Sequence, residues 1–118
     1  MINPSIPLVE LHRHLDGNVR LETILDISRK HNLPLPAKDI EGLRPFIQVT
    51  DSKSSILDYF AKFEWLVKSM VDYDAVHRIA YENVEDASNE GIDYIELRFS
   101  PWFMAEKNGL NPTGIVEA

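Results

Sequence analysis

The hydrophobic pattern changes period along the chain, and the change predicts where strands and helices lie. Residues 6–12 form a short apolar run that is too short for a helix, and Asp16-Gly17-Asn18 is typical of the turn that ends it. Apolar residues alternate with polar ones over residues 92–100, and Pro101 ends that alternation. The pattern therefore predicts one strand near each end of the chain.

Between these strands, apolar residues recur at steps of three and four, which predicts amphipathic helices. The first runs over residues 20–31 and ends at Asn32, and a short helix is expected over 39–43. The second carries an apolar stripe over 56–70, with capping candidates at 51–54. The third begins at a cap at Asp74 and ends before Gly91. A last helix begins near Gly114, with Thr113 as its cap.

The order strand, helices, strand, helix is that of a parallel α/β fold with long insertions. Two strands cannot close such a sheet, and a barrel of this kind needs about 250 residues. We therefore expect residues 1–118 to be the N-terminal part of a single larger barrel domain, with the rest of that domain beyond residue 118.

Composition narrows the function. The 118 residues have a formal charge of −7 and contain no cysteine. These values exclude a disulfide scaffold, a cysteine zinc finger and a cysteine nucleophile, and they disfavour a nucleic-acid partner. No apolar run approaches the roughly 20 residues of a membrane span, and no secretory leader is recognisable, so we expect a cytoplasmic protein.

The candidate chemistry lies at His12-Arg13-His14. Side chains two residues apart in a strand point to the same face, with Cα atoms about 6.6 Å apart, so both imidazoles can reach one metal ion. Ligation by nitrogen and oxygen suits Zn²⁺ best, although Fe, Mn, Co or Ni would also fit. Asp16 has the same parity if the strand continues. The spacing alone leaves open a second interpretation, in which the histidines are solvated polar residues at a strand end.

Several segments together resemble a known family. Glu10-Leu11-His12-Arg13-His14-Leu15-Asp16-Gly17 resembles the first-strand signature of the adenosine deaminases, which are metal-dependent amidohydrolases with a (β/α)₈ TIM barrel. Further similar stretches are Ala61-Lys62-Phe63, Arg78-Ile79-Ala80-Tyr81-Glu82 and Tyr94-Ile95-Glu96-Leu97-Arg98-Phe99-Ser100-Pro101. The resemblance covers nearly the whole chain, and the bacterial members are the most similar.

The resemblance implies a zinc hydrolase that converts adenosine and 2′-deoxyadenosine to inosine and 2′-deoxyinosine with release of ammonia. His12 and His14 would be two ligands of one zinc ion per complete subunit, and His14 would also lie beside the purine nucleoside. Asp16 would accept a hydrogen bond from the ribose 5′-hydroxyl. The family's catalytic Glu, third His ligand and Asp pair lie on later strands, so residues 1–118 contain no catalytic residue and are expected to be inactive alone.

Two alternatives remain. An adenine deaminase or another purine amidohydrolase is similar, but such relatives tend to carry Glu where Asp16 stands, and the shorter Asp leaves room for a ribose. A non-catalytic module with a structural histidine pair is the second alternative. By the same resemblance, residues 56–63 are similar to a helix that gates the purine pocket, although simple helix packing is the favoured explanation for any single residue of the stripe. Glu96 and Arg98 could support the floor of the site or join an ion network between strands.

Overall fold

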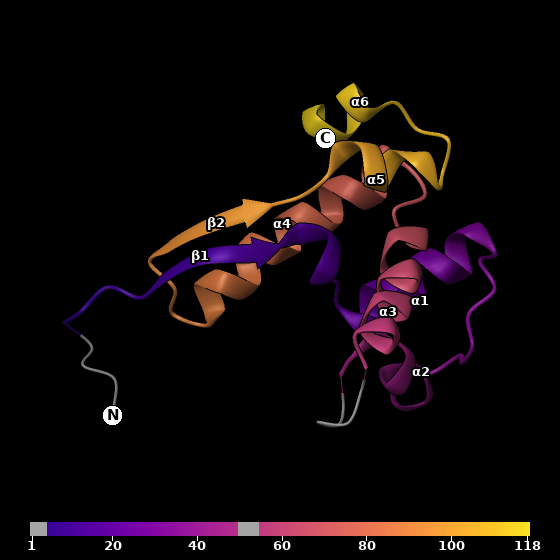
Figure 1. Ribbon diagram of the computed structural model, residues 1–118, viewed down its shortest axis with the longest axis horizontal. Coiled ribbons are helices and arrows are strands. Elements are labelled where there is room, and N and C mark those ends of the chain that lie inside the picture. The colour runs from indigo at the N-terminus through magenta and orange to yellow at the C-terminus, as the bar shows by residue number, and fades with distance from the viewer. Residues whose placement is uncertain (1–4, 50–54) are drawn as a thin grey trace.

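The computed structural model describes residues 5–49 and 55–118, which form two parallel strands with helices packed beside them (Figure 1). In chain order the elements are β1 (Val9–His14), a 3₁₀ turn η1 (Leu15–Gly17), α1 (Leu21–His31), α2 (Ile40–Ile47), α3 (Ile56–Lys68), α4 (Tyr73–Asn89), β2 (Tyr94–Arg98), α5 (Pro101–Glu106) and α6 (Pro112–Glu117).

The sheet positions the histidine segment. β1 pairs with β2 in parallel, from Val9 opposite Tyr94 to His14 opposite Arg98, and α1 to α4 form the crossover between them. The predicted pair of parallel strands with inserted helices is therefore confirmed. The first strand lies slightly later than the expected 6–12, so that both His12 and His14 belong to its C-terminal end. In parallel α/β folds that end is where ligands bind.

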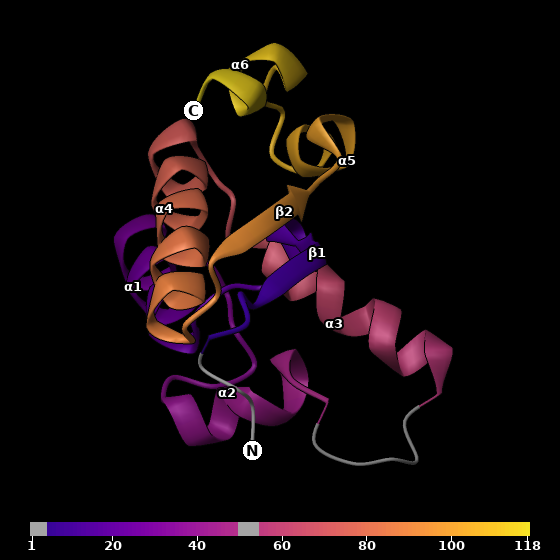
Figure 2. The same cartoon turned by 90° about the vertical axis from the view of Figure 1, so that its left-hand side faces the viewer.

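Two apolar cores hold the helices against each other. The first lies between α1, α4, α5 and α6 and includes Met70, Ile79 and Met104, each at most 1% exposed. The second joins α1, α2 and α3 around Ile24 and Leu43, which are fully buried. Figure 2 shows α1 and α4 lying side by side on one flank of the strands, with α3 on the other flank. Helix α1 contributes to both cores and so links the two halves of the molecule.

The helix ends follow local backbone chemistry, and two expected stops are confirmed. Asn32 adopts the left-handed conformation after α1 (φ 54°), and Gly91 does so after α4 (φ 75°). The expected cap of α4 at Asp74 is wrong, because the side chain of Asp72 accepts the hydrogen bond from the Ala75 amide (2.8 Å). Asp72 has the extended backbone that a cap needs, whereas Asp74 already lies inside the helix.

Three other helices also begin differently from the prediction. Ser55 caps α3 in a reciprocal pair with Asp58, and the expected candidates at 51–54 lie outside the described residues. Asn111, rather than Thr113, caps α6. The prediction missed α5, in which Ser100 is the cap and Pro101 the first residue. Proline is favoured at that position because it fixes a helical φ where no amide donor is needed.

Helix α2 is longer than the expected 39–43 and runs through Pro45. Proline in a helix interior removes one hydrogen bond, which is why the prediction ended early. Leu43 and Ile47 lie on either side of Pro45 and are both buried in the second core. Their burial offsets the missing bond.

The apolar stripe of α3 is only half buried. Val67 is fully buried, but Ile56 is 66% exposed and Phe60 61% exposed. Figure 2 shows why: the N-terminal half of α3 projects away from α1 and α4. Simple helix packing within the described residues therefore explains the C-terminal half of the stripe but not Ile56 and Phe60. Tyr59 instead contacts Phe60 and Phe63 edge to face.

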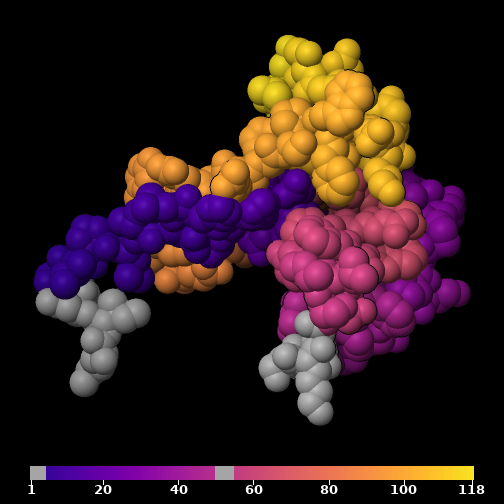
Figure 3. Space-filling view, in the orientation of Figure 1, coloured from indigo at the N-terminus to yellow at the C-terminus, as the bar shows by residue number. Residues whose placement is uncertain are grey.

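The described residues form an open shape. The strands and the C-terminal half of α4 extend to one side of the other helices (Figure 3), and Val9 and Leu11 on β1 expose their apolar side chains. The radius of gyration is 15.1 Å, against about 13.5 Å for a compact domain of this length. None of the helices in the described part of the chain is both long and apolar enough to cross a bilayer.

We expect a polypeptide of residues 1–118, produced by itself, to aggregate or to remain molten. Val9 is 54% exposed, Leu11 61% and Trp102 68%, so the sheet and its rim present apolar surface and unpaired strand edges to water. Calorimetry and near-ultraviolet circular dichroism should show no cooperative transition. A cooperative melt of a soluble monomer would contradict this expectation.

Candidate metal centre

The rings of His12 and His14 converge at the end of β1. Their Nε2 atoms lie 3.3 Å apart, and the ring centroids are 5.2 Å apart with an interplanar angle of 49°. Both side chains are accessible to solvent. The two residues that the sequence singled out therefore point their outer nitrogens at a common region of space.

An irregularity in β1 lies at this point. Glu10 is opposite Ile95 and Arg13 is opposite Leu97, so three steps along β1 match two along β2, and the extra residue forms a bulge around Leu11 and His12. Bulges turn a side chain away from the direction that a regular strand would give it, and they are frequent beside active sites. The prediction assumed a regular strand, so it did not contain this bulge.

Asp16 lies beside the histidines, but it is placed there by a turn and not by the strand. The strand does not continue to Asp16, so the parity argument for this residue is wrong; Asp16 lies in the 3₁₀ turn η1. The turn places its Oδ1 atom 3.5 Å from Nδ1 of His14. Asp16 is only 5% exposed, and its Oδ1 accepts no hydrogen bond within the described residues. A buried carboxylate oxygen without a partner is costly, which favours a ligand there.

Arg98 lies against His12 from the neighbouring strand. Its Nη1 atom is 3.2 Å from both ring nitrogens of His12. Because β1 and β2 are parallel, their C-terminal ends share one edge of the sheet, and this rule could have placed Arg98 beside the histidines from sequence alone. Glu96 accepts a hydrogen bond from the Tyr94 hydroxyl (3.0 Å), and this bond, together with the charge of Glu96, raises the pKa of that hydroxyl. Of the two charged residues, Arg98 thus contacts the candidate site.

Helix α3 covers the turn that carries Asp16. A Cβ atom at Gly17 would lie 3.0 Å from Cζ of Phe63, closer than side chains normally approach. Glycine at this position therefore allows the Phe63 ring to lie directly on the turn. Phe63 is the link between the exposed aromatic face of α3 and the histidine site, and the apolar stripe alone did not identify that contact.

The two histidines fit one half of a zinc site. Two nitrogens held at 2.0–2.1 Å by a tetrahedral ion lie about 3.3–3.4 Å apart, and the observed separation is 3.3 Å. A ligating histidine usually directs its other ring nitrogen at a carboxylate, and Nδ1 of His14 faces Asp16 in this way. Across the described residues, no group of three or more His, Cys, Asp or Glu side chains could enclose a metal ion. The other positions need ligands from elsewhere.

The remaining histidines lie outside this site. His31 Nε2 is 3.4 Å from Asp72 Oδ2, between α1 and the start of α4. Nδ1 of His77 is 2.7 Å from the carbonyl oxygen of Ala118. Both contacts are packing or surface contacts, and neither partner lies on a strand.

The sequence and the structure were compared with those of known proteins to identify the family of this chain. The adenosine deaminase family profile matches residues 7–118. The adenosine deaminase of Shewanella loihica is 55% identical over all 118 residues, which span 36% of that protein. Among solved structures, an Arabidopsis deaminase complexed with GMP is 30% identical with a TM-score of 0.71, over 97% of this chain and 32% of that one.

The adenine deaminase of Arthrobacter aurescens is 22% identical with a TM-score of 0.77, over 95% of this chain and 34% of that one, and it supports the fold alone. The chain thus spans about a third of the length of the relatives that it matches. Its strands and helices are those of the N-terminal part of a (β/α)₈ barrel, as the sequence predicted. On this evidence the chain belongs to the adenosine deaminase family.

Proposed function

We propose that this chain is the N-terminal part of an adenosine deaminase. In this proposal the C-terminal end of β1, with the turn that follows it, supplies two metal ligands and the group that binds the ribose. The complete protein would hydrolyse adenosine and 2′-deoxyadenosine to inosine and 2′-deoxyinosine plus ammonia. The observation that carries the proposal is the meeting of three side chains at one strand end: the two Nε2 atoms 3.3 Å apart, and the unpartnered carboxylate oxygen of Asp16 beside His14.

In this proposal His12 and His14 hold a zinc ion through their Nε2 atoms. Zinc lowers the pKa of water and so supplies a nucleophile at neutral pH. Asp16 Oδ1 lies 3.5 Å from Nδ1 of His14, and a proton on Nδ1 facing this carboxylate would leave Nε2 available as a ligand. This tautomer is the one that ligation requires.

The same carboxylate selects the ribose end of the substrate. Asp16 is 95% buried by its own chain, so an ionised carboxylate there needs a donor, and a ribose 5′-hydroxyl supplies one. A 5′-phosphate would bring a second negative charge against it and would be repelled. Adenine carries no ribose and would leave the carboxylate without its partner. Asp16 thus favours the nucleoside over both the nucleotide and the free base.

The groups that protonate the purine and complete the zinc ligands are expected outside residues 1–118. Glu96 bonds Tyr94 on β2 rather than facing the histidines, so it does not fill the role of a catalytic acid. Residues 1–118 alone should therefore be inactive. The cytoplasmic location and the single barrel domain stay predictions.

The full-length gene product should deaminate adenosine with a kcat/KM at least about a hundredfold above that for adenine or adenosine 5′-monophosphate, because the latter two cannot satisfy Asp16. Spectrophotometric conversion of each substrate measures this. A preference for adenine would support the adenine deaminase alternative. No activity on any of the three would contradict the proposed function and support a non-catalytic module.

Zinc binding tests the histidines separately from activity. The full-length gene product should hold about one zinc ion per chain by elemental analysis, and either His12→Ala or His14→Ala should weaken zinc binding by more than about a hundredfold, since each removes a ligand. His77→Ala is the matched control, because it removes an accessible histidine in α4 and should leave zinc unchanged. Full zinc occupancy in both β1 variants, measured by competition with a chelator, would refute the assignment.

A further inference from the structure

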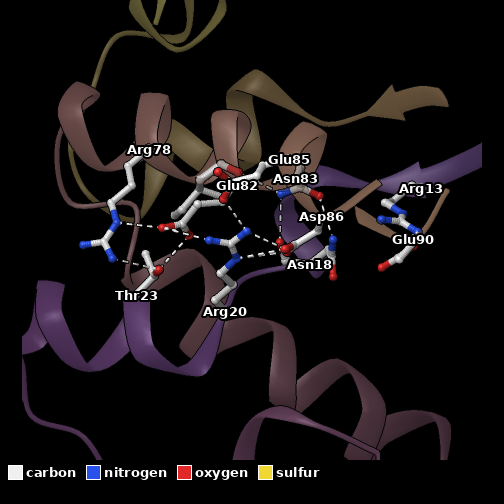
Figure 4. A network of polar contacts seen from close by, with 11 residues as sticks. Arg13, Asn18, Arg20, Thr23, Arg78, Glu82, Asn83, Glu85, Asp86 and Glu90 are labelled. Carbon is white, nitrogen blue, oxygen red and sulfur yellow. Dashed lines mark hydrogen bonds and ion pairs between the residues drawn. The ribbon is translucent and has the colours of Figure 1, made fainter. Parts of the chain in front are cut away.

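The segment that carries the candidate site is attached at three places to helix α4 or to Glu90, the residue that caps its C-terminus (Figure 4). On the segment side the anchors are Arg13, before the site, and Asn18 and Arg20, after it. The contacts are Arg13 with Glu90 (2.5 Å), Asn18 with Asn83 (2.8 Å), and Arg20 with Asp86 (2.5 Å) and Glu85 (2.7 Å). His14 and Asp16 lie between the first and second anchors, so one helix and its cap residue hold both ends of the site segment.

Of the three contacts, only the one between Asn18 and Asn83 holds the backbone of the site segment as well as a side chain. Asn83 is 1% exposed, and its Oδ1 accepts a hydrogen bond from Nδ2 of Asn18. Its own Nδ2 donates to the carbonyl oxygen of Asn18 (2.8 Å) and to that of Ile79 within α4 (2.9 Å). Asn18 is thus bound at two points to a side chain that cannot move without disturbing the helix.

The other two anchors, Arg13 and Arg20, form ion pairs, which hold the segment less precisely than the amide pair does. Both Arg13 and Arg20 are long side chains, and their contacts leave the backbone of the segment free. The hydrogen bonds that the Arg20 guanidinium donates to Asp86 raise its pKa, although this group is charged in any case. These pairs hold the segment near α4, whereas the reciprocal amide pair sets its position.

Asn18 is linked to Asp16 through the turn η1, so the position of Asn18 affects that of Asp16. The Asn18 amide donates to the carbonyl oxygen of Leu15 (3.4 Å), so residues 15–18 move as one turn. Asp16 Oδ1 has no hydrogen-bond partner of its own within the described residues. Because no hydrogen bond from a described residue holds Oδ1, its position depends on the turn backbone, and Asn83 binds that backbone at the carbonyl oxygen of Asn18.

We propose that Asn83 is a positioning residue for Asp16: it acts through Asn18 to hold the carboxylate where a ribose 5′-hydroxyl donates to it. The proposal rests on the proposed function, because it concerns the nucleoside that Asp16 receives. Asn83 touches no substrate. Supporting groups of this kind matter because a displacement of about 1 Å at a binding group costs large factors in affinity or rate.

The test uses nucleoside binding by the full-length gene product, measured by calorimetry with inosine and 5′-deoxyinosine. Asn83→Ala should weaken inosine binding about tenfold and should change 5′-deoxyinosine binding less than about twofold, because only inosine carries the hydroxyl that Asp16 receives. In an Asp16→Ala background, Asn83→Ala should have no further effect on inosine, since a positioning residue loses its effect when its target is absent.

Thr23→Val is the matched control. Thr23 is fully buried in the same α1–α4 interface and donates to Glu82 (2.6 Å), but it does not contact the site segment. It should lower the melting temperature and leave the ratio of the two affinities unchanged. If Asn83→Ala does not fold, Asn18→Ala removes the side-chain half of the amide pair from the half-buried side of the contact and keeps the bond from Asn83 Nδ2 to the carbonyl oxygen of residue 18, so it should give a smaller loss of the same selectivity.

Equal weakening of both nucleosides by the Asn83 or Asn18 variant, or additive effects of Asn83→Ala and Asp16→Ala, would overturn the proposal and leave Asn83 a purely structural residue. These results differ from failure of the proposed function itself. In that case the unaltered protein would bind neither nucleoside, and both proposals would fall together.

Discussion

The site depends on the approach of two imidazole nitrogens at the end of one strand. Nε2 of His12 and Nε2 of His14 lie 3.3 Å apart, a distance that suits two ligands of one tetrahedral ion. The strand bulge around His12 and the turn at Asp16 both serve this arrangement, because one aims the first ring and the other fixes the second. The proposed zinc chemistry and ribose selection follow from these nitrogens and the neighbouring carboxylate.

The molecule supports this site from one side. Helix α4 and its C-terminal cap residue hold the segment at Arg13, Asn18 and Arg20, and the apolar face of the helix is buried against α1, α5 and α6. On the other side the strands present apolar side chains and free edges, and α3 projects outward with half its apolar stripe exposed. A firmly held strand end beside an open sheet agrees with the N-terminal third of a barrel, in which neighbouring elements would cover the exposed faces.

Local rules predicted the elements, but not how they meet. Periodicity located both strands and the long helices, and Asn32 and Gly91 marked helix ends correctly, because these signals depend on a few neighbouring residues. The sequence also identified His12, His14 and Asp16 as neighbours. It gave the wrong reason for Asp16, since a change from strand to 3₁₀ turn is not visible in a strand pattern. The contacts of Phe63 and Asn83 with the site segment were missed because each comes from an element distant in sequence, whereas Arg98 had been named as a possible support of the site floor.

The most direct measurement is anomalous diffraction at the zinc edge from crystals of the full-length gene product grown with zinc. The account predicts one strong peak within about 2.0–2.1 Å of both Nε2 atoms at the end of β1, with Asp16 still facing Nδ1 of His14. A peak elsewhere, or rings turned apart with no density between them, would contradict the account at its central point.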